Sequence, residues 1–299
     1  MEIQSNAVKP VGSIEEGWNI IKDDYWMFFA MSLVFIVIVI AVGFLVGLIQ
    51  NGISAGIAIA IGAVKTEGSA ATAAMVIPQL ISLTIGIFTN ILVATLTGIL
   101  MCGFMKALSR KVQTGMVDFG DLFSAFDKLQ PCLIYSVILS LVQYVIGIGA
   151  VVVGVVFGVT LSAESLLKNG KFDPEMVKGL IGIFLVIAVI AIILNLIIGI
   201  CTAFVYPLIA ERNLSGLEAL STGIRGGLSN FLPLIGFFIL QGLMAFGGAL
   251  LCFVGVLFVV PLLYASTFAA YRQVFGGIAG SFMNQQPPPP PIFNNQPNY

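Results

Sequence analysis

The sequence has no histidine and very few charged residues. Of its 299 residues, only 9% are Asp, Glu, Lys or Arg, whereas 59% are hydrophobic. A soluble domain usually carries about 25% charged residues. Because a single core cannot hide this much apolar surface, the composition predicts an integral membrane protein.

The missing residue types also exclude several kinds of site. Without histidine, the chain lacks the commonest general base and metal ligand, and it cannot form a Ser-His or Cys-His nucleophile pair. Its 13 basic and 14 acidic residues give a net charge of −1, so no basic field favours nucleic acid. We therefore expect no enzymatic activity, no cofactor, no metal site and no nucleic-acid partner.

Cysteine is scarce and is not arranged as a motif. The four cysteines contain no CxxC pair, and each lies in or beside an apolar stretch: Cys102, Cys132, Cys201 and Cys252. This spacing indicates neither a zinc site nor a disulfide framework. We interpret the cysteines as small buried hydrophobic side chains.

Long charge-free intervals define the predicted membrane spans. A spanning helix needs about 20 apolar residues, and the interval 226–271 is long enough to fold back near Gly247 to Gly255. The sequence predicts an all-α bundle of six transmembrane helices, at 26–49, 76–104, 132–160, 179–207, 231–250 and 254–273. The remainder of the first interval, from Asn51 to Val64, is expected to be an interfacial or re-entrant piece.

The chain divides into three regions around these spans. Residues 1–25 are expected to be a cytoplasmic segment with an interfacial helix, and residues 26–281 form the membrane domain. Residues 282–299 are rich in Pro, Gln and Asn, and the run Pro287–Pro291 favours extended polyproline II structure. This tail is either a docking segment for a protein partner or a solubilising spacer.

Basic residues predict the orientation of the spans. Six spans place both termini on one side, and that side carries nine of the 13 basic residues. Because basic residues concentrate on the cytoplasmic side of a membrane, we expect cytoplasmic termini.

Three cytoplasmic segments that precede a predicted helix pair look alike. Each has a capping residue followed three positions later by an acid, as in a capping box. The pairs are Ser13 and Glu16, Asp118 and Asp121, and Ser215 and Glu218. We interpret this pattern as three repeated hairpins, each preceded by an interfacial helix.

Polar chemistry inside the spans is restricted to uncharged groups, which argues against proton-coupled transport. Four amides fall near the middle of predicted spans: Asn90, Gln143, Asn195 and Gln241. They are either structural hydrogen bonds between helices or a polar cluster that lines a pathway for a neutral solute.

Two further patterns concern lipids and helix packing. Lys106, Arg110 and Lys111 follow the second span, where they either contact anionic lipid head groups or act as an ordinary positive-inside anchor. Small residues at spacing four, such as Gly43 and Gly47, predict close packing of helices within the bundle, with a dimer face as the alternative.

Several segments resemble a known family. The inner loop Gly103 to Leu108, Gly115 and Asp118 to Phe126 is similar to that of a broad bacterial family of uncharacterised six-span inner-membrane proteins. That family is related to the membrane domain of some glycerophosphodiester phosphodiesterases. The resemblance extends over Pro207 to Thr222 and Pro261 to Gly276. It implies a six-helix protein of the bacterial inner membrane and brings no catalytic residues.

Two functions follow as expectations. The first is a non-enzymatic scaffold or accessory subunit that contacts membrane lipids and a protein partner. The second is a permease or channel for a neutral or lipidic solute, which is the function that the four amides favour. A membrane subunit of an export or envelope-maintenance complex is a third interpretation.

Overall fold

The computed structural model describes residues 3–62, 69–169, 174–251 and 254–276, and none of them forms a strand. Six helical segments in these ranges are long and apolar enough to cross a membrane. The prediction of an all-α bundle with six spans is confirmed. The C-terminal tail, including Pro287–Pro291, lies outside the described residues.

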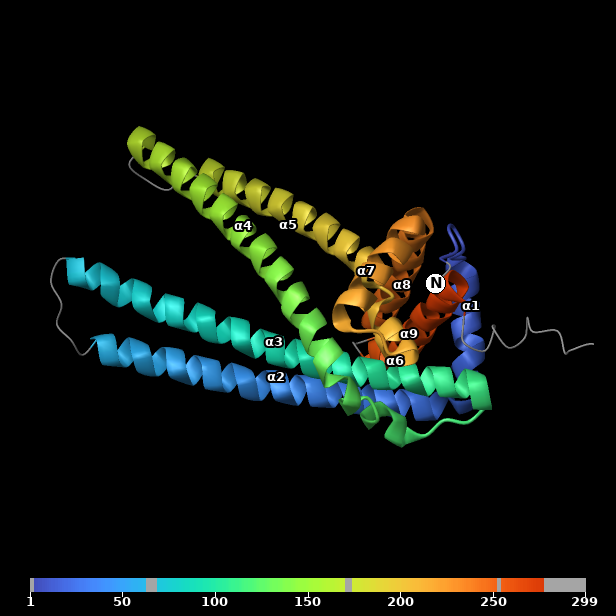
Figure 1. The fold of residues 1–299 in the computed structure, drawn as a ribbon. Coiled ribbons are helices and arrows are strands. Elements are labelled where there is room, and N and C mark those ends of the chain that lie inside the picture. The colour runs from blue at the N-terminus through green and yellow to red at the C-terminus, as the bar shows by residue number, and fades with distance from the viewer. Residues whose placement is uncertain (1–2, 63–68, 170–173, 252–253, 277–299) are drawn as a thin grey trace, which may run out of the picture.

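The long helices form three pairs that are consecutive in the chain. They are α2 (Tyr25–Gly62) with α3 (Ser69–Thr114), α4 (Leu129–Asn169) with α5 (Pro174–Thr202), and α8 (Phe231–Leu250) with α9 (Val254–Phe275). Short elements connect them: α1 (Pro10–Ile21), η1 (Lys22–Asp24), η2 (Phe119–Phe123), η3 (Phe126–Lys128), α6 (Val205–Arg212) and α7 (Gly216–Ser229). In Figure 1 the first two pairs extend away from a compact end and diverge, and α1 lies crosswise to α2.

The first helix is longer than predicted. α2 has 38 residues and continues to Gly62, so the interfacial or re-entrant piece expected from Asn51 onward is wrong for the described residues. This stretch has no proline, and its Ala and Ile residues continue the apolar helix. At 1.5 Å per residue, α2 is about 57 Å long, against about 30 Å for the hydrocarbon core of a bilayer.

The outer ends of the other helices also differ in part from the prediction. α4 continues to Asn169, so residues 161–169 are helical rather than loop. α5 begins at Pro174, five residues before the predicted span, because the fixed φ of proline suits the first helical turn. α8 and α9 meet at the predicted turn, where a Cβ on Gly255 would lie 2.5 Å from the Gly248 carbonyl oxygen.

The buried core lies at the compact end. Its largest fully buried aromatic side chains are Tyr271, Phe28, Phe104, Phe204, Phe237 and Phe268. By contrast, the outer parts of the first two pairs expose large apolar side chains, such as Phe44 at 65% and Val145 at 71%. Lipid tails are as apolar as these side chains, so the exposed surfaces suit a hydrocarbon environment.

A docking contact recurs three times at the compact end. η2 packs on α3 and α7 packs on α5, so each of these short elements contacts the second helix of the preceding pair. α1 packs on α9, which is the second helix of the last pair. A glycine permits the close approach in each contact. A Cβ added at Gly17 would lie 2.6 Å from the Ser266 nitrogen, and one added at Gly103 would lie 2.0 Å from the Leu122 oxygen. A Cβ added at Gly227 would lie 2.3 Å from the Ile200 oxygen. The three units share this contact and their element order, but their helices differ in length.

The predicted capping boxes have three different outcomes. At α7 the box is confirmed, because Ser215 Oγ accepts from the Glu218 backbone and the Glu218 carboxylate accepts from the Ser215 backbone. Asp118 caps the 3₁₀ helix η2 by accepting from the Gly120 backbone N–H at 2.9 Å. Its expected partner Asp121 accepts instead from Arg110 at 3.0 Å.

The capping box at Ser13 and Glu16 is wrong. α1 begins three residues earlier, at Pro10, where proline is favoured because its missing N–H would have no helical partner. Ser13 is buried and donates to Gln273 Oε1 at 3.1 Å, and Glu16 lies 3.3 Å from Arg272 Nη1. Both side chains therefore connect α1 to α9.

The N-terminal segment is held by one buried amide. Asn230 is fully buried, its Oδ1 accepts from the Ala7 backbone N–H at 2.7 Å, and its Nδ2 donates to the Gln4 carbonyl at 2.9 Å. The Gln4 backbone N–H also donates to the Val274 carbonyl at 3.0 Å. Residues near the start of the chain are thus attached to α8 and α9.

Candidate functional site

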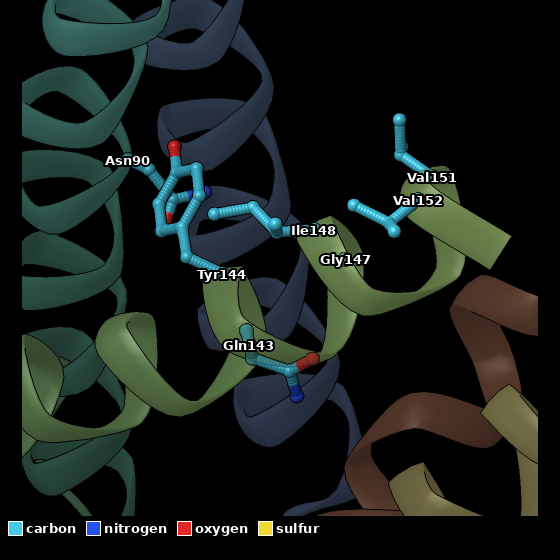
Figure 2. Close-up of a pocket in the computed structure, with 7 residues that line it drawn as sticks. All are labelled: Asn90, Gln143, Tyr144, Gly147, Ile148, Val151 and Val152. Carbon is cyan, nitrogen blue, oxygen red and sulfur yellow. The ribbon is translucent and has the colours of Figure 1, made fainter. Parts of the chain in front are cut away.

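An open cavity of about 580 Å³ lies between α3 and α4. One amide, Asn90, comes from α3, and the other lining residues recur along one face of α4: Gln143, Tyr144, Gly147, Ile148, Val151 and Val152. Figure 2 shows Asn90 beside the ring of Tyr144, with the valines farther along α4. The cavity therefore has a polar end and an aliphatic end.

A second cavity of about 330 Å³ adjoins the first and shares Asn90 and Tyr144 with it. The walls of this second cavity come mainly from α2 and α3 and include Gly43, Gly47, Gln50, Gly86, Thr89 and Val93. These residues recur at spacings of three and four, which places them on the facing sides of the two helices. Among the residues described around the two cavities, none is charged.

Glycines make room for the second cavity. No described atom outside the local backbone lies within 4 Å of a Cβ added at Gly43 or Gly47. The prediction that these small residues pack closely against another helix of the bundle is wrong. At these positions the missing side chains leave open space beside α3 and α4.

The two amides at the first cavity are hydrogen-bonded in different directions. Asn90 Oδ1 accepts from Ser140 Oγ at 3.2 Å, which connects α3 to α4. Gln143 Nε2 donates to Asn195 Oδ1 at 3.0 Å, which connects α4 to α5. In Figure 2 the Gln143 side chain accordingly points away from Asn90.

The four predicted amides do not form one cluster. Gln241 lies in the third helix pair, where Nε2 donates to the Leu263 carbonyl at 3.0 Å and to Ser266 Oγ at 2.9 Å. Asn195 lies on α5 behind Gln143 and donates to its own helix at Ala191. Of the four amides, Asn90 and Gln143 line the first cavity; Asn195 contacts Gln143 from α5, and Gln241 belongs to the third helix pair.

Some polar groups at the cavities are without a hydrogen-bond partner among the described residues. They include the Tyr144 hydroxyl and the Gln50 amide. The Asn90 Nδ2 group belongs with them, because the hydrogen bond of Asn90 with Ser140 uses Oδ1. Such groups are costly in hydrocarbon unless water or a ligand pairs with them. The cavities thus offer hydrogen-bond donors to a bound molecule.

Sequence reasoning missed Gln50, Tyr144 and Ser140 as site residues. Gln50 lies seven residues after Gly43, a helical spacing that places both on one face. That signal was present, but the first span was expected to end at residue 49. Tyr144 and Ser140 flank Gln143, and only the packing of α4 against α3 shows that they face Asn90.

The three basic residues proposed to contact lipid head groups all bind within the chain. Lys106 Nζ donates to the Ser124 carbonyl at 3.0 Å, and Arg110 pairs with Asp121. Lys111 pairs with Asp24 and donates to the Gly115 carbonyl. They hold the C-terminal end of α3 to η1 and η2, and their contact with lipids stays a prediction.

The cysteines of the compact end behave mostly as expected. Cys102 and Cys132 are fully buried, and their Sγ atoms are 3.6 Å apart across the α3–α4 contact. Cys201 is half-buried, and Cys252 lies outside the described residues. The interpretation as small buried side chains is confirmed for Cys102 and Cys132.

A scan against protein-family models, a search of curated proteins and a search of solved structures each found no match to this chain. The resemblance to the bacterial family therefore stays a prediction.

Proposed function

We propose that this chain is a non-enzymatic multi-pass membrane protein that binds a lipidic solute between its first two helix pairs. The observation that carries the proposal is the cavity of about 580 Å³, which has amides and a tyrosine at one end and aliphatic side chains at the other. Ligand pockets usually measure about 300–1,000 Å³ and combine apolar walls with a few polar groups.

The surroundings of the cavity support entry from the bilayer. The outer surfaces of α2 and α4 are apolar, as the exposed Phe44 and Val145 show. The divergence of α3 and α4 leaves the cavity open rather than enclosed. An acyl chain can therefore pass from the bilayer into the cavity without crossing water.

Charge supports the orientation and location. Basic residues from three elements, α3, α9 and α6, lie at the compact end, where Lys111 pairs with Asp24, Arg272 with Glu16, and Arg212 donates to the Phe275 carbonyl. The positive-inside rule assigns this end to the cytoplasm. We place the chain in a bacterial inner membrane with this face and both termini cytoplasmic.

A scaffold or accessory subunit is the second candidate. The observation that favours it is helix length, because α3 and α4 have 46 and 41 residues and exceed the thickness of one bilayer. Apolar segments that extend beyond the hydrocarbon need tilt or the cover of another protein. Co-purification of a stoichiometric subunit that protects these outer segments from proteolysis would favour this function.

Gly147→Phe tests lipid binding with a matched control. Gly147 lines the cavity, and no described atom lies within 4 Å of an added Cβ, so a phenyl ring fits the fold while it fills the site. Gly182→Phe adds the same ring to an open position on α5. We expect Gly147→Phe to lower the lipid retained in mild detergent about tenfold, or about 1.4 kcal/mol, as measured by native mass spectrometry. Equal retention in both variants would refute binding in this cavity.

A further inference from the structure

The two neighbouring cavities differ in their walls although they share Asn90 and Tyr144. The first is bounded beyond these residues by Ile148, Val151 and Val152. The second is bounded by glycines and by the polar side chains of Gln50 and Thr89 from α2 and α3, together with Val46 and Val93. Beyond Asn90 and Tyr144, the lining is therefore mainly aliphatic in the first cavity and contains a larger share of polar groups in the second.

We infer that the two cavities form one bipartite site for a single-chain amphiphile with an uncharged head group that carries hydroxyl and carbonyl groups. The head group occupies the second cavity, and the chain runs along α4 in the first. This inference rests on the proposed function and adds the class and the orientation of the ligand.

Hydrogen-bond chemistry supports this head group. Tyr144 and the Asn90 Nδ2 group offer donors, and the Gln50 amide offers both a donor and an acceptor. A hydroxyl and an ester carbonyl match this set because together they also donate and accept. Pairing removes the cost of polar groups that would otherwise face hydrocarbon.

The distribution of charge excludes an ionised head group. Along α3 the nearest described charged side chain to Asn90 is Lys106, 16 residues away, which corresponds to about 24 Å of helix. Lys128 is equally far from Tyr144 along the chain, and it pairs with Asp127. A phosphate in the second cavity would have no counter-charge among the described lining residues, which is unfavourable where hydrocarbon surrounds the cavity.

The volumes favour one chain rather than two. The second cavity, at about 330 Å³, suits a small head group, and the first, at about 580 Å³, suits part of one acyl chain. Gly43 and Gly47 set the size of the head-group cavity, because any side chain at these positions would project into it.

Two probes that have the same acyl chain and differ by one phosphate group test the head group. Monooleoylglycerol is neutral, whereas oleoyl lysophosphatidic acid has the same chain and an added phosphate. We expect the neutral lipid to bind the full chain in nanodiscs at least tenfold more tightly, measured by competition against a photoreactive monoacylglycerol. Equal or tighter binding of the phosphate lipid would overturn the inference.

Photo-crosslinking tests the orientation. A monoacylglycerol with a diazirine at the chain end should label α4 near Val151 and Val152. The same lipid with the diazirine beside the glycerol should label α2 near Gly47 and Gln50. The reverse pattern, or identical patterns for the two probes, would overturn the bipartite arrangement.

Glycine substitutions supply variants that keep the fold. Gly47→Val fills the head-group cavity, whereas Gly52→Val places the same side chain on α2 at another open position. We expect about tenfold weaker binding of monooleoylglycerol for Gly47→Val and no change for Gly52→Val. Tyr144→Phe should also weaken binding, with Tyr264→Phe on α9 as the control for loss of a hydroxyl.

The outcomes separate the inference from the proposed function. If neither lipid labels the α3–α4 cavity, the proposed function fails and the inference fails with it. If the lipids label the cavity but Gly47→Val binds monooleoylglycerol as the unsubstituted chain does, the proposed function stands and the head-group assignment is wrong.

Discussion

The two ends of α3 have opposite surroundings. Near its C-terminal end, Phe104 is fully buried and Gly103 lies against the η2 backbone. Four turns earlier, Asn90 faces an open cavity and makes a single hydrogen bond to α4. One continuous helix thus belongs to a packed core at one end and to a binding site at the other. The core fixes where the helix pairs begin to diverge, and the divergence creates the site.

The comparison predicts that the largest loss of stability comes from the packed end. Phe104→Ala removes a fully buried ring that contacts Phe28 and Tyr264, with ring centroids 5.8 and 5.2 Å away. We expect a loss of about 3–5 kcal/mol in the free energy of unfolding, measured by thermal or denaturant unfolding in detergent. Phe44→Ala on the exposed part of α2 is the control, and a similar loss there would contradict the comparison.

Removal of the buried amide that holds the N-terminal segment should have the next largest effect. Asn230→Leu leaves the Ala7 N–H and the Gln4 carbonyl without their partner inside the compact end. An unsatisfied buried group costs about 1–3 kcal/mol, and hydrogen exchange of residues 4–8 should accelerate. The matched variant Asn195→Leu should leave exchange in that segment unchanged. Slow exchange in Asn230→Leu would show that other contacts hold the segment.

The confirmed capping box should contribute less. Ser215→Ala removes the oxygen that accepts from the Glu218 backbone, and loss of such a cap costs about 1 kcal/mol. The midpoint of unfolding should fall modestly, and Ser215→Asp should restore it. A variant that unfolds like the original chain would mean that the packing of α7 on α4, α5 and α6 holds this helix without the cap.

The smallest effect is expected at the open end. Asn90→Leu removes one hydrogen bond between α3 and α4, and such bonds in membrane proteins average about 0.6 kcal/mol. We expect little change in unfolding but a clear loss of lipid retention. A loss of stability as large as that of Phe104→Ala would mean that Asn90 is a core residue rather than a site residue.

The sequence was sufficient for the parts of the fold that depend on composition. Charge-free intervals predicted the six spans, and the apolar character of residues around Cys102 and Cys132 predicted their burial. The capping box at Ser215 was correct because it depends only on residues within one helical turn. These features depend on local chemistry, which can be read from the order of residues.

The errors concern choices that only packing decides. Ser13 and Glu16 have the spacing of a capping box. In the structure, however, Ser13 donates to Gln273 and Glu16 accepts from Arg272, both on α9. The amides were predicted as one group because they share a depth in the membrane. Depth does not specify which helices are neighbours, and the structure assigns Gln241 to a different pair from Asn90.

The contact of α1 with α9 has a consequence for biogenesis. α1 leaves the ribosome first, but the surface that it covers belongs to the last described helix, and Gln4 pairs with Val274. Closing so long a loop carries a large entropic cost and is expected late in folding. Each helix pair can enter the bilayer as it is synthesised, whereas the N-terminal segment can dock only after α9 has been synthesised. Its docking therefore follows the synthesis of α9, and a chain that stalls before α9 would leave the α1 docking face exposed to quality-control proteases.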